Sequence, residues 1–190
     1  CLFIFIGCTH KSKAPVNSTL PIFDLTKDYP EKTIDLQEIA EVEYIPLETT
    51  EKSVAMIHAN PHISEKYIIN CDLGGPVHFY DRQGKHLYAL HANGQGPQEY
   101  YGIVAFTVDF PKEEFYIYDL RKLQVYSFTG EWKRTLKVPE GMRYENLFNY
   151  DEHHLICENA FHDWWNFENL PIDKTPYYLI NKETGTPTPL

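Results

Sequence analysis

The chain has 190 residues, of which 43% are hydrophobic and 23% are charged, a composition typical of one globular domain with its own core. Its net charge of −10 argues against nucleic acid as a partner and against electrostatic binding to an anionic membrane surface, because both require clustered Lys and Arg. The aromatic share of 15%, with 14 Tyr and 11 Phe, favours strands, on whose pleated surface such side chains pack well.

The first residues, CLFIFIGC, form a short apolar run that turns polar after Cys8. This pattern indicates the end of a signal peptide, and residues 5–8 resemble the lipobox of bacterial lipoproteins, although Phe5 stands where Leu is usual. We therefore predict that residues 1–7 are a signal remnant, that Cys8 carries lipid and holds the chain at the membrane, and that residues 8–33 are a flexible tether. The alternative is a buried first strand with an incidental Cys.

Residues 34–190 are predicted to form one all-β domain, because short apolar or alternating runs follow one another with turn residues between them. These runs are EVEYIPL, SVAMIHA, KYIINC, PVHFY, HLYAL, VAFTVDF, EFYIYD, LQVYSF, TLKV, HLIC and YYLI. Only TIDLQEIAEV, residues 33–42, suggests a helical turn.

The runs repeat. Residues 77–90 align with residues 123–136 at a constant shift of 46, which brings the turn residue Gly84 onto Gly130. A weaker third copy begins at residue 153, is interrupted after HHLICEN, and resumes at YYLINKETG, where Gly185 takes the turn position. A repeat of this length with about four strands per unit is typical of a β-propeller blade, whereas a β-sandwich would not repeat one unit at a fixed shift. We expect about three four-stranded blades of a larger ring, in a chain cut at both ends.

The stretch HANGQGPQEYYG, residues 91–102, could be mistaken for a phosphate-binding loop. A dinucleotide fingerprint needs a third Gly where Glu99 stands, and it opens a helix, whereas strand-like sequence follows here; no Gly-Lys-Ser/Thr follows either. We therefore predict no nucleotide and no other cofactor. Gly94, Gly96 and Pro97 are interpreted as a structural connector between two repeats, in which Asn93 and the glycines supply positive φ.

The same stretch, Gly94 to Tyr100, resembles the Gly-x-Gly-Pro-Gly-Glu-aromatic signature of six-bladed β-propeller lipoproteins of Gram-negative bacteria. Residues 44–50 resemble the opening of that family's first blade, and residues 79–85 resemble its strand and turn. Gln98 departs from the family's Gly. The resemblance covers roughly residues 34–138 and implies a fold of six blades in the complete ring and a lipid anchor, but no catalytic residues.

The sequence contains no strong motif for catalysis or metal binding. No GxSxG, HExxH or SxxK occurs, and the nine His are interpreted as ordinary surface or core residues, so no metal site is predicted. Asp72 and Asp119 recur at one site of each repeat and are interpreted as turn caps. Cys71 and Cys157 lie in apolar runs and are interpreted as small buried side chains, with a disulfide between them left open.

The segment that interrupts the third repeat offers the best functional lead, because aromatic side chains crowd an otherwise polar stretch. Two interpretations stay open: packing over the core, and an exposed ligand-binding rim. The candidate ligand-binding residues are Phe161, His162, Asp163, Trp164, Trp165 and Asn166.

From these features we predict a lipid-anchored β-propeller of the bacterial cell envelope that binds a glycan, a peptide or a partner protein and performs no catalysis of its own. Two alternatives stay open: a propeller enzyme acting on glycans, a lyase or hydrolase with its catalytic residues in blades outside this sequence, and a sensory ectodomain.

Overall fold

A computed structural model describes residues 23–50, 61–71, 75–159 and 175–190. By its internal contacts the chain divides into two units, residues 1–43 and residues 44–190. In the first unit the described residues contain a single 3₁₀ turn, η1 (Leu36–Glu38), at the site where the sequence suggests a helical turn. The described residues include no helix long and apolar enough to cross a membrane.

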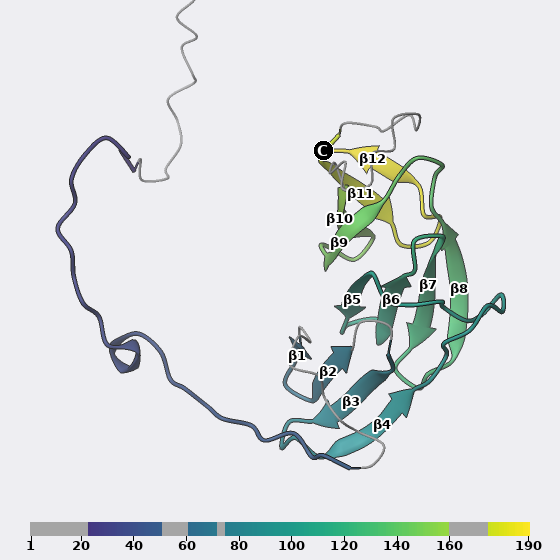
Figure 1. The fold of residues 1–190 in the computed structure, drawn as a ribbon, viewed down its shortest axis with the longest axis horizontal. Coiled ribbons are helices and arrows are strands. Elements are labelled where there is room, and N and C mark those ends of the chain that lie inside the picture. Colours follow the sequence, from purple (N-terminus) through teal and green to yellow (C-terminus); the bar gives the residue numbers. More distant parts are fainter. Residues whose placement is uncertain (1–22, 51–60, 72–74, 160–174) are drawn as a thin grey trace, which may run out of the picture. The chain divides into compact units, whose positions relative to one another are not determined.

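The second unit consists of three four-stranded antiparallel sheets, each built from strands in chain order. Figure 1 shows the first strands of the three sheets, β1, β5 and β9, lying near one another, with the fourth strands on the opposite side. The prediction of an all-β domain made of four-stranded units is therefore confirmed. The first sheet contains β1 (His62–Ile63), β2 (Tyr67–Cys71), β3 (Val77–Asp81) and β4 (His86–Leu90); the second contains β5 (Ala105–Asp109), β6 (Glu114–Tyr118), β7 (Lys122–Ser127) and β8 (Trp132–Lys137); the third contains β9 (Tyr144–Asn149), β10 (His154–Asn159), β11 (Tyr177–Asn181) and β12 (Pro187–Pro189).

The repeat seen in the sequence is also a repeat of backbone geometry. The turns between the third and fourth strands contain Gly84, Gly130 and Gly185, with φ of 81°, 84° and 75°, values that glycine adopts without steric cost. In addition, the pairing of the third with the fourth strand shifts register between Phe79 and Tyr80 in the first sheet and between Val125 and Tyr126 in the second, positions 46 residues apart. The predicted alignment of the repeats is thus confirmed for these sheets.

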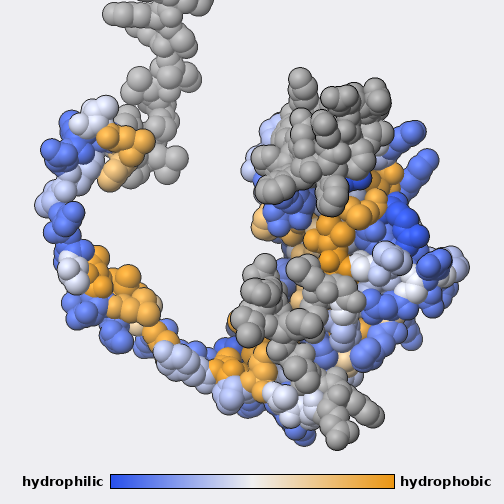
Figure 2. Space-filling view, in the orientation of Figure 1, coloured by the Kyte–Doolittle hydropathy of each residue, from blue (hydrophilic) through white to orange (hydrophobic). Residues whose placement is uncertain are grey.

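The hydrophobic core lies between the sheets, and the second sheet is buried on both faces. Along β6, Phe115 and Ile117 pack in the cluster shared with the first sheet, whereas Tyr116 and Tyr118 pack in the cluster shared with the third. This follows from the two-residue period of a strand, which sends successive side chains to opposite faces. Figure 2 shows mostly hydrophilic residues on the visible described surface of this unit, with apolar residues gathered between the second and third sheets.

Two details differ from the sequence-based expectation. Residues 41–47, expected as a strand, form no strand, and their exposed residues lie outside any ladder in the described part of the chain. β1, β9 and β12 were not expected. β12 contains Pro187 and Pro189, which lack the N–H that a ladder needs, and it tolerates them because it is paired on one side only, with β11. The strand expected at residues 53–59 lies outside the described residues.

Candidate functional site

Each sheet has two distinct ends, because the turns of an antiparallel meander alternate between them. The hairpins that join first to second strands and third to fourth strands lie at one end, here called the hairpin end. The β6–β7 turn and the connections from β4 to β5 and from β8 to β9 lie at the other, here called the connector end. β10 ends and β11 begins at this connector end as well. Long connections therefore gather at one end, which is where binding residues on a rigid scaffold are expected.

The predicted connector runs from β4 to β5, and its glycines serve a different purpose from the expected one. Asn93, Gly94 and Gly96 do not have positive φ, so that part of the prediction is wrong. Instead, the Glu99 carboxylate folds back and accepts a hydrogen bond of 2.8 Å from the Gly96 N–H. A Cβ on Gly94 would lie 1.9 Å from Glu99 Oε2, so glycine is required because the carboxylate approaches the backbone closely.

The connector is fastened to the second sheet through its own carbonyl groups. Gln124 of β7 donates from Nε2 to the carbonyls of Pro97 (2.8 Å) and Glu99 (3.0 Å), and the Tyr126 hydroxyl donates to that of Gln98. Lys122 donates to the Gly96 carbonyl at 3.0 Å. Carbonyls engaged in this way, beside an anionic Glu99, offer a phosphate nothing to bind. The geometry is that of a structural joint.

Asp119, at the end of β6, organises the connector end of the second sheet. Its buried carboxylate accepts hydrogen bonds from the backbone N–H groups of Arg121 (3.0 Å) and Lys122 (3.0 Å) in the turn, and from that of Tyr101 (3.2 Å) in the connector. The interpretation of Asp119 as a turn cap is therefore confirmed, whereas Asp72 lies outside the described residues. In the third sheet, Asn159 accepts a bond from Arg143 N–H in the same manner.

Exposed side chains gather around this cap. Tyr101 is 68% exposed, and the Arg121 guanidinium lies over its ring, 5.4 Å from the centroid. Leu120, between Asp119 and Arg121, is 53% exposed although its φ is +73°, a conformation in which a branched side chain is strained. Val104 is half-exposed, and its N–H donates to the Tyr118 carbonyl, which places it beside the same turn. We call Tyr101, Val104, Leu120 and Arg121 the Tyr101 patch.

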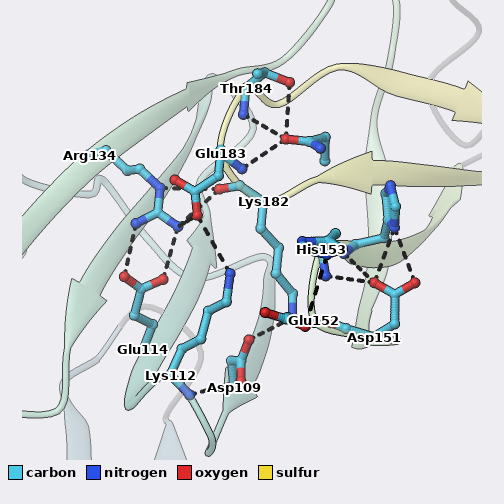
Figure 3. A network of polar contacts seen from close by, with 12 residues as sticks. Asp109, Lys112, Glu114, Arg134, Asp151, Glu152, His153, Lys182, Glu183 and Thr184 are labelled. Carbon is cyan, nitrogen blue, oxygen red and sulfur yellow. Dashed lines mark hydrogen bonds and ion pairs between the residues drawn. The ribbon is translucent and has the colours of Figure 1, made fainter.

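The hairpin end carries a charged cluster of a different kind (Figure 3), which joins the second sheet to the third. Arg134 of β8 forms a two-pronged ion pair with Glu114 of β6, with both N···O distances 2.9 Å, and also donates to the Lys182 carbonyl in the β11–β12 turn. The Lys182 side chain is fully buried, and its amine donates to Asp109 Oδ2 and to the Asp151 carbonyl.

The protonation of this cluster fits a structural role. Burial raises the pKa of Glu114, but hydrogen bonds and charge attraction from Arg134 lower it more, so the net pKa lies below the ordinary value and the carboxylate stays ionised. Burial also raises the pKa of Tyr116, whose hydroxyl donates to Glu114, well above the usual range. Glu114, Tyr116, Arg134 and Lys182 each therefore have a partner inside the protein.

The remaining predicted site residues divide simply. Cys8 and the aromatic segment, Phe161 to Asn166, lie outside the described residues. Cys157 is a buried free thiol, and Cys71 is half-buried. Within the described ranges, no three His, Cys, Asp or Glu side chains gather as metal ligands would. Sequence reasoning missed the Tyr101 patch; the available signal was the doubled Tyr100-Tyr101, of which one ring is buried and the other is exposed.

Comparison with known proteins places the chain in a family. Residues 20–187 match the family model described as "Domain of unknown function (DUF4934)". The fold is similar to the crystal structure of a protein from Bacteroides fragilis described as a "Putative exported protein", with a TM-score of 0.62, 14% identity, and coverage of 78% of this chain and 41% of that one. The chain thus spans less than half the length of that protein, and at this identity the likeness concerns the fold alone. A comparison with curated proteins found no match. Because the family model covers most of the sequence, the chain belongs to the DUF4934 family.

Proposed function

We propose that this chain is part of a lipid-anchored β-propeller of the bacterial cell envelope, which acts by binding a glycan, a peptide or a partner protein. Three observations support the propeller: three four-stranded meanders in chain order, contact between the first strands β5 and β9, and hydrophobic clusters between neighbouring sheets. The similar B. fragilis protein, described as exported, supports a place outside the cytoplasm.

The observation that carries the binding proposal is the Tyr101 patch. A large ring and a guanidinium stand exposed at the connector end, and one buried carboxylate, Asp119, holds the backbone N–H groups of both residues. The Arg121 guanidinium also lies 3.5 Å from that carboxylate and packs over the Tyr101 ring. Such preorganised, exposed aromatic and Arg side chains are the kind that contribute most to recognition, because little entropy is lost when a ligand binds. The charged cluster at the hairpin end, by contrast, has its hydrogen bonds satisfied within the protein.

Leu120 strengthens this argument. The turns between the third and fourth strands use Gly84, Gly130 and Gly185 where φ is positive, and the β5–β6 hairpin has Glu113 with a φ of 50°. The β6–β7 turn uses a leucine, with the larger φ of 73°, and leaves its branched side chain exposed. A strained conformation that a glycine would relieve, and that packing does not explain, is typical of a functional contact.

The test is a binding screen with glycans and peptides that uses Tyr101→Ala and Arg121→Gln. Tyr150→Ala is the matched control, because Tyr150 is 60% exposed and lies in the β9–β10 turn at the hairpin end. We expect both patch variants to lose at least about tenfold in affinity, equivalent to about 1.4 kcal/mol, with an unchanged melting temperature. Equal binding by all three variants would refute the patch as the binding surface.

The aromatic segment belongs to the same proposal. Trp164 and Trp165 offer flat faces with an N–H donor, suited to stacking on a sugar ring or an apolar side chain. We expect one of Trp164→Ala and Trp165→Ala to abolish binding without lowering the melting temperature. If both variants only destabilise the fold, the segment serves packing.

The lipid anchor is tested separately. Each buried methylene contributes about 0.8 kcal/mol, and two acyl chains anchor a protein stably. When the protein is expressed with its full signal sequence, Cys8→Ala is therefore expected to move from the membrane fraction to the soluble fraction. Retention of the variant in the membrane would contradict lipidation of Cys8.

A further inference from the structure

The second and third sheets each present one exposed side chain at an equivalent place at the connector end. In the second sheet, the buried Asp119 carboxylate after β6 accepts a hydrogen bond of 3.2 Å from the Tyr101 N–H. In the third sheet, the buried Asn159 side chain at the end of β10 accepts one of 3.3 Å from the Arg143 N–H. β6 and β10 are the second strands of their sheets, and both donor residues lie shortly before the first strand. Tyr101 and Arg143 therefore occupy corresponding positions, and both are exposed.

The two positions belong to one surface, because a pair of buried tyrosines joins the two sheets between them. The ring centroids of Tyr118, the last residue of β6, and Tyr144, the first residue of β9, lie 4.9 Å apart. The Tyr118 hydroxyl donates to the Leu120 carbonyl at 3.3 Å. Arg121 directly follows Leu120, and Arg143 directly precedes Tyr144. Arg121 and Arg143 thus flank the same tyrosine pair, one from each sheet.

The charges of this surface favour an anionic ligand. Burial raises the pKa of Tyr118 to about 12, and the nearby positive charge of Arg143 acts against this rise. Two acids of the region are already engaged: the Asp119 carboxylate accepts three backbone N–H groups, and Glu99 accepts the Gly96 N–H. Two exposed guanidinium groups therefore lie beside acids that have donors of their own, and they keep N–H groups available for the acceptors of a ligand.

We propose that the connector end binds an extended acidic glycan, in which Arg121 and Arg143 each pair with a carboxylate of the polymer and Tyr101 stacks on a sugar ring. This inference rests on the binding function proposed above and names its ligand. The planar donors of a guanidinium match the two oxygens of a carboxylate, and an exposed aromatic ring suits the apolar face of a sugar. A polymer with a carboxylate on each ring supplies both contacts at every repeat, as a surface that recurs from sheet to sheet requires.

Isothermal titration calorimetry with polygalacturonate, alginate and hyaluronan tests the proposal, with the methyl ester of each polymer as the uncharged control and polyglutamate as the acidic peptide control. We expect at least one carboxylated glycan to bind, more weakly as salt increases, and its methyl ester to bind at least about tenfold more weakly. Arg121→Gln and Arg143→Gln should each lower this affinity about tenfold, and both together about a hundredfold, with an unchanged melting temperature. Lys133→Gln, which removes one exposed charge from β8, should leave the affinity unchanged.

The outcomes separate this inference from the proposed function. Binding of a neutral glycan or a peptide that depends on Tyr101, without binding of any carboxylated glycan, would keep the binding function and overturn the acidic ligand. Equal affinity for a polymer and its methyl ester would do the same. A loss of affinity in Arg121→Gln but not in Arg143→Gln would confine the site to one sheet and overturn the extended ligand. If no glycan and no peptide binds, the inference and the proposed binding function fail together.

Discussion

The buried amine of Lys182 provides the sharpest test of how the second and third sheets are joined. Its side chain is fully buried and its Nζ lies 2.5 Å from Asp109 Oδ2, whose side chain is 3% exposed. Lys182→Met keeps the length of the side chain but leaves the Asp109 carboxylate buried without its counter-charge. Removal of one partner of a buried ion pair costs about 3–5 kcal/mol. At about 2–4 °C per kcal/mol for a chain of this size, the melting temperature should fall by about 6–20 °C.

The assay is urea unfolding of four proteins: the parent, Lys182→Met, Asp109→Asn and the double variant. Because the double variant leaves no unpaired charge, it should be more stable than the sum of the single changes predicts, with a coupling energy of about 1–3 kcal/mol. Lys112→Met is the matched control, since its amine makes a single exposed ion pair, 3.5 Å from Glu183, that contributes little. A loss below about 1 kcal/mol for Lys182→Met, equal to that of the control, would refute the reasoning.

The Glu114 ion pair, the Gly94 connector and the Leu120 turn can each be tested in the same way. The pKa of Glu114 is lowered in the folded state, so its contribution to stability is fully present above the ordinary value of 4.5 and is lost as pH falls through the lowered value. Glu114→Gln should therefore weaken the protein at neutral pH. It should also flatten the acid side of a stability–pH curve measured by urea unfolding. Gly94→Ala should displace the Glu99 carboxylate and lower the free energy of unfolding by about 1 kcal/mol, whereas Gly94→Ala combined with Glu99→Ala should show no further loss. Leu120→Gly should raise the free energy of unfolding by up to about 1 kcal/mol, because glycine adopts positive φ without strain. The same change should weaken the binding of any ligand at the Tyr101 patch. A loss of stability would show that the Leu120 side chain serves packing.

The sequence predicted the parts of the fold that depend on local pattern. Alternating apolar residues marked most strands of the sheets, and the glycine that recurs in each repeat marked the turns at Gly84, Gly130 and Gly185, because a positive φ is a local requirement that one residue type satisfies. The same rule failed at Gly94 and Gly96, where glycine is needed for the approach of a side chain from further along the chain. A positive φ and the close approach of a side chain both require glycine, so the sequence alone does not distinguish them.

Long-range polar contacts could not be predicted in this way. The sequence around Lys182 indicates an exposed turn, because lysine is rarely buried and the neighbouring residues are polar. It is buried because Asp109, 73 residues earlier, lies opposite it across the joint between two sheets. The Tyr101 patch was missed for the same reason, since Tyr101 and Arg121 meet only after the β6–β7 turn folds beside the connector.

The two ends of the sheets use charge in opposite ways, and this difference bears on function. At the hairpin end, Arg134 makes its hydrogen bonds to Glu114 and to the Lys182 carbonyl, and these contacts join the second sheet to the third. At the connector end, the Arg121 side chain is 55% exposed, and its guanidinium forms an ion pair with the buried Asp119 carboxylate at 3.5 Å. A guanidinium that is positioned but still largely hydrated can exchange water for a ligand's acceptor groups at little cost. The charged groups at the hairpin end thus make their contacts inside the protein, whereas Arg121 at the connector end stays largely exposed, which is why the proposed binding experiments begin with Tyr101 and Arg121.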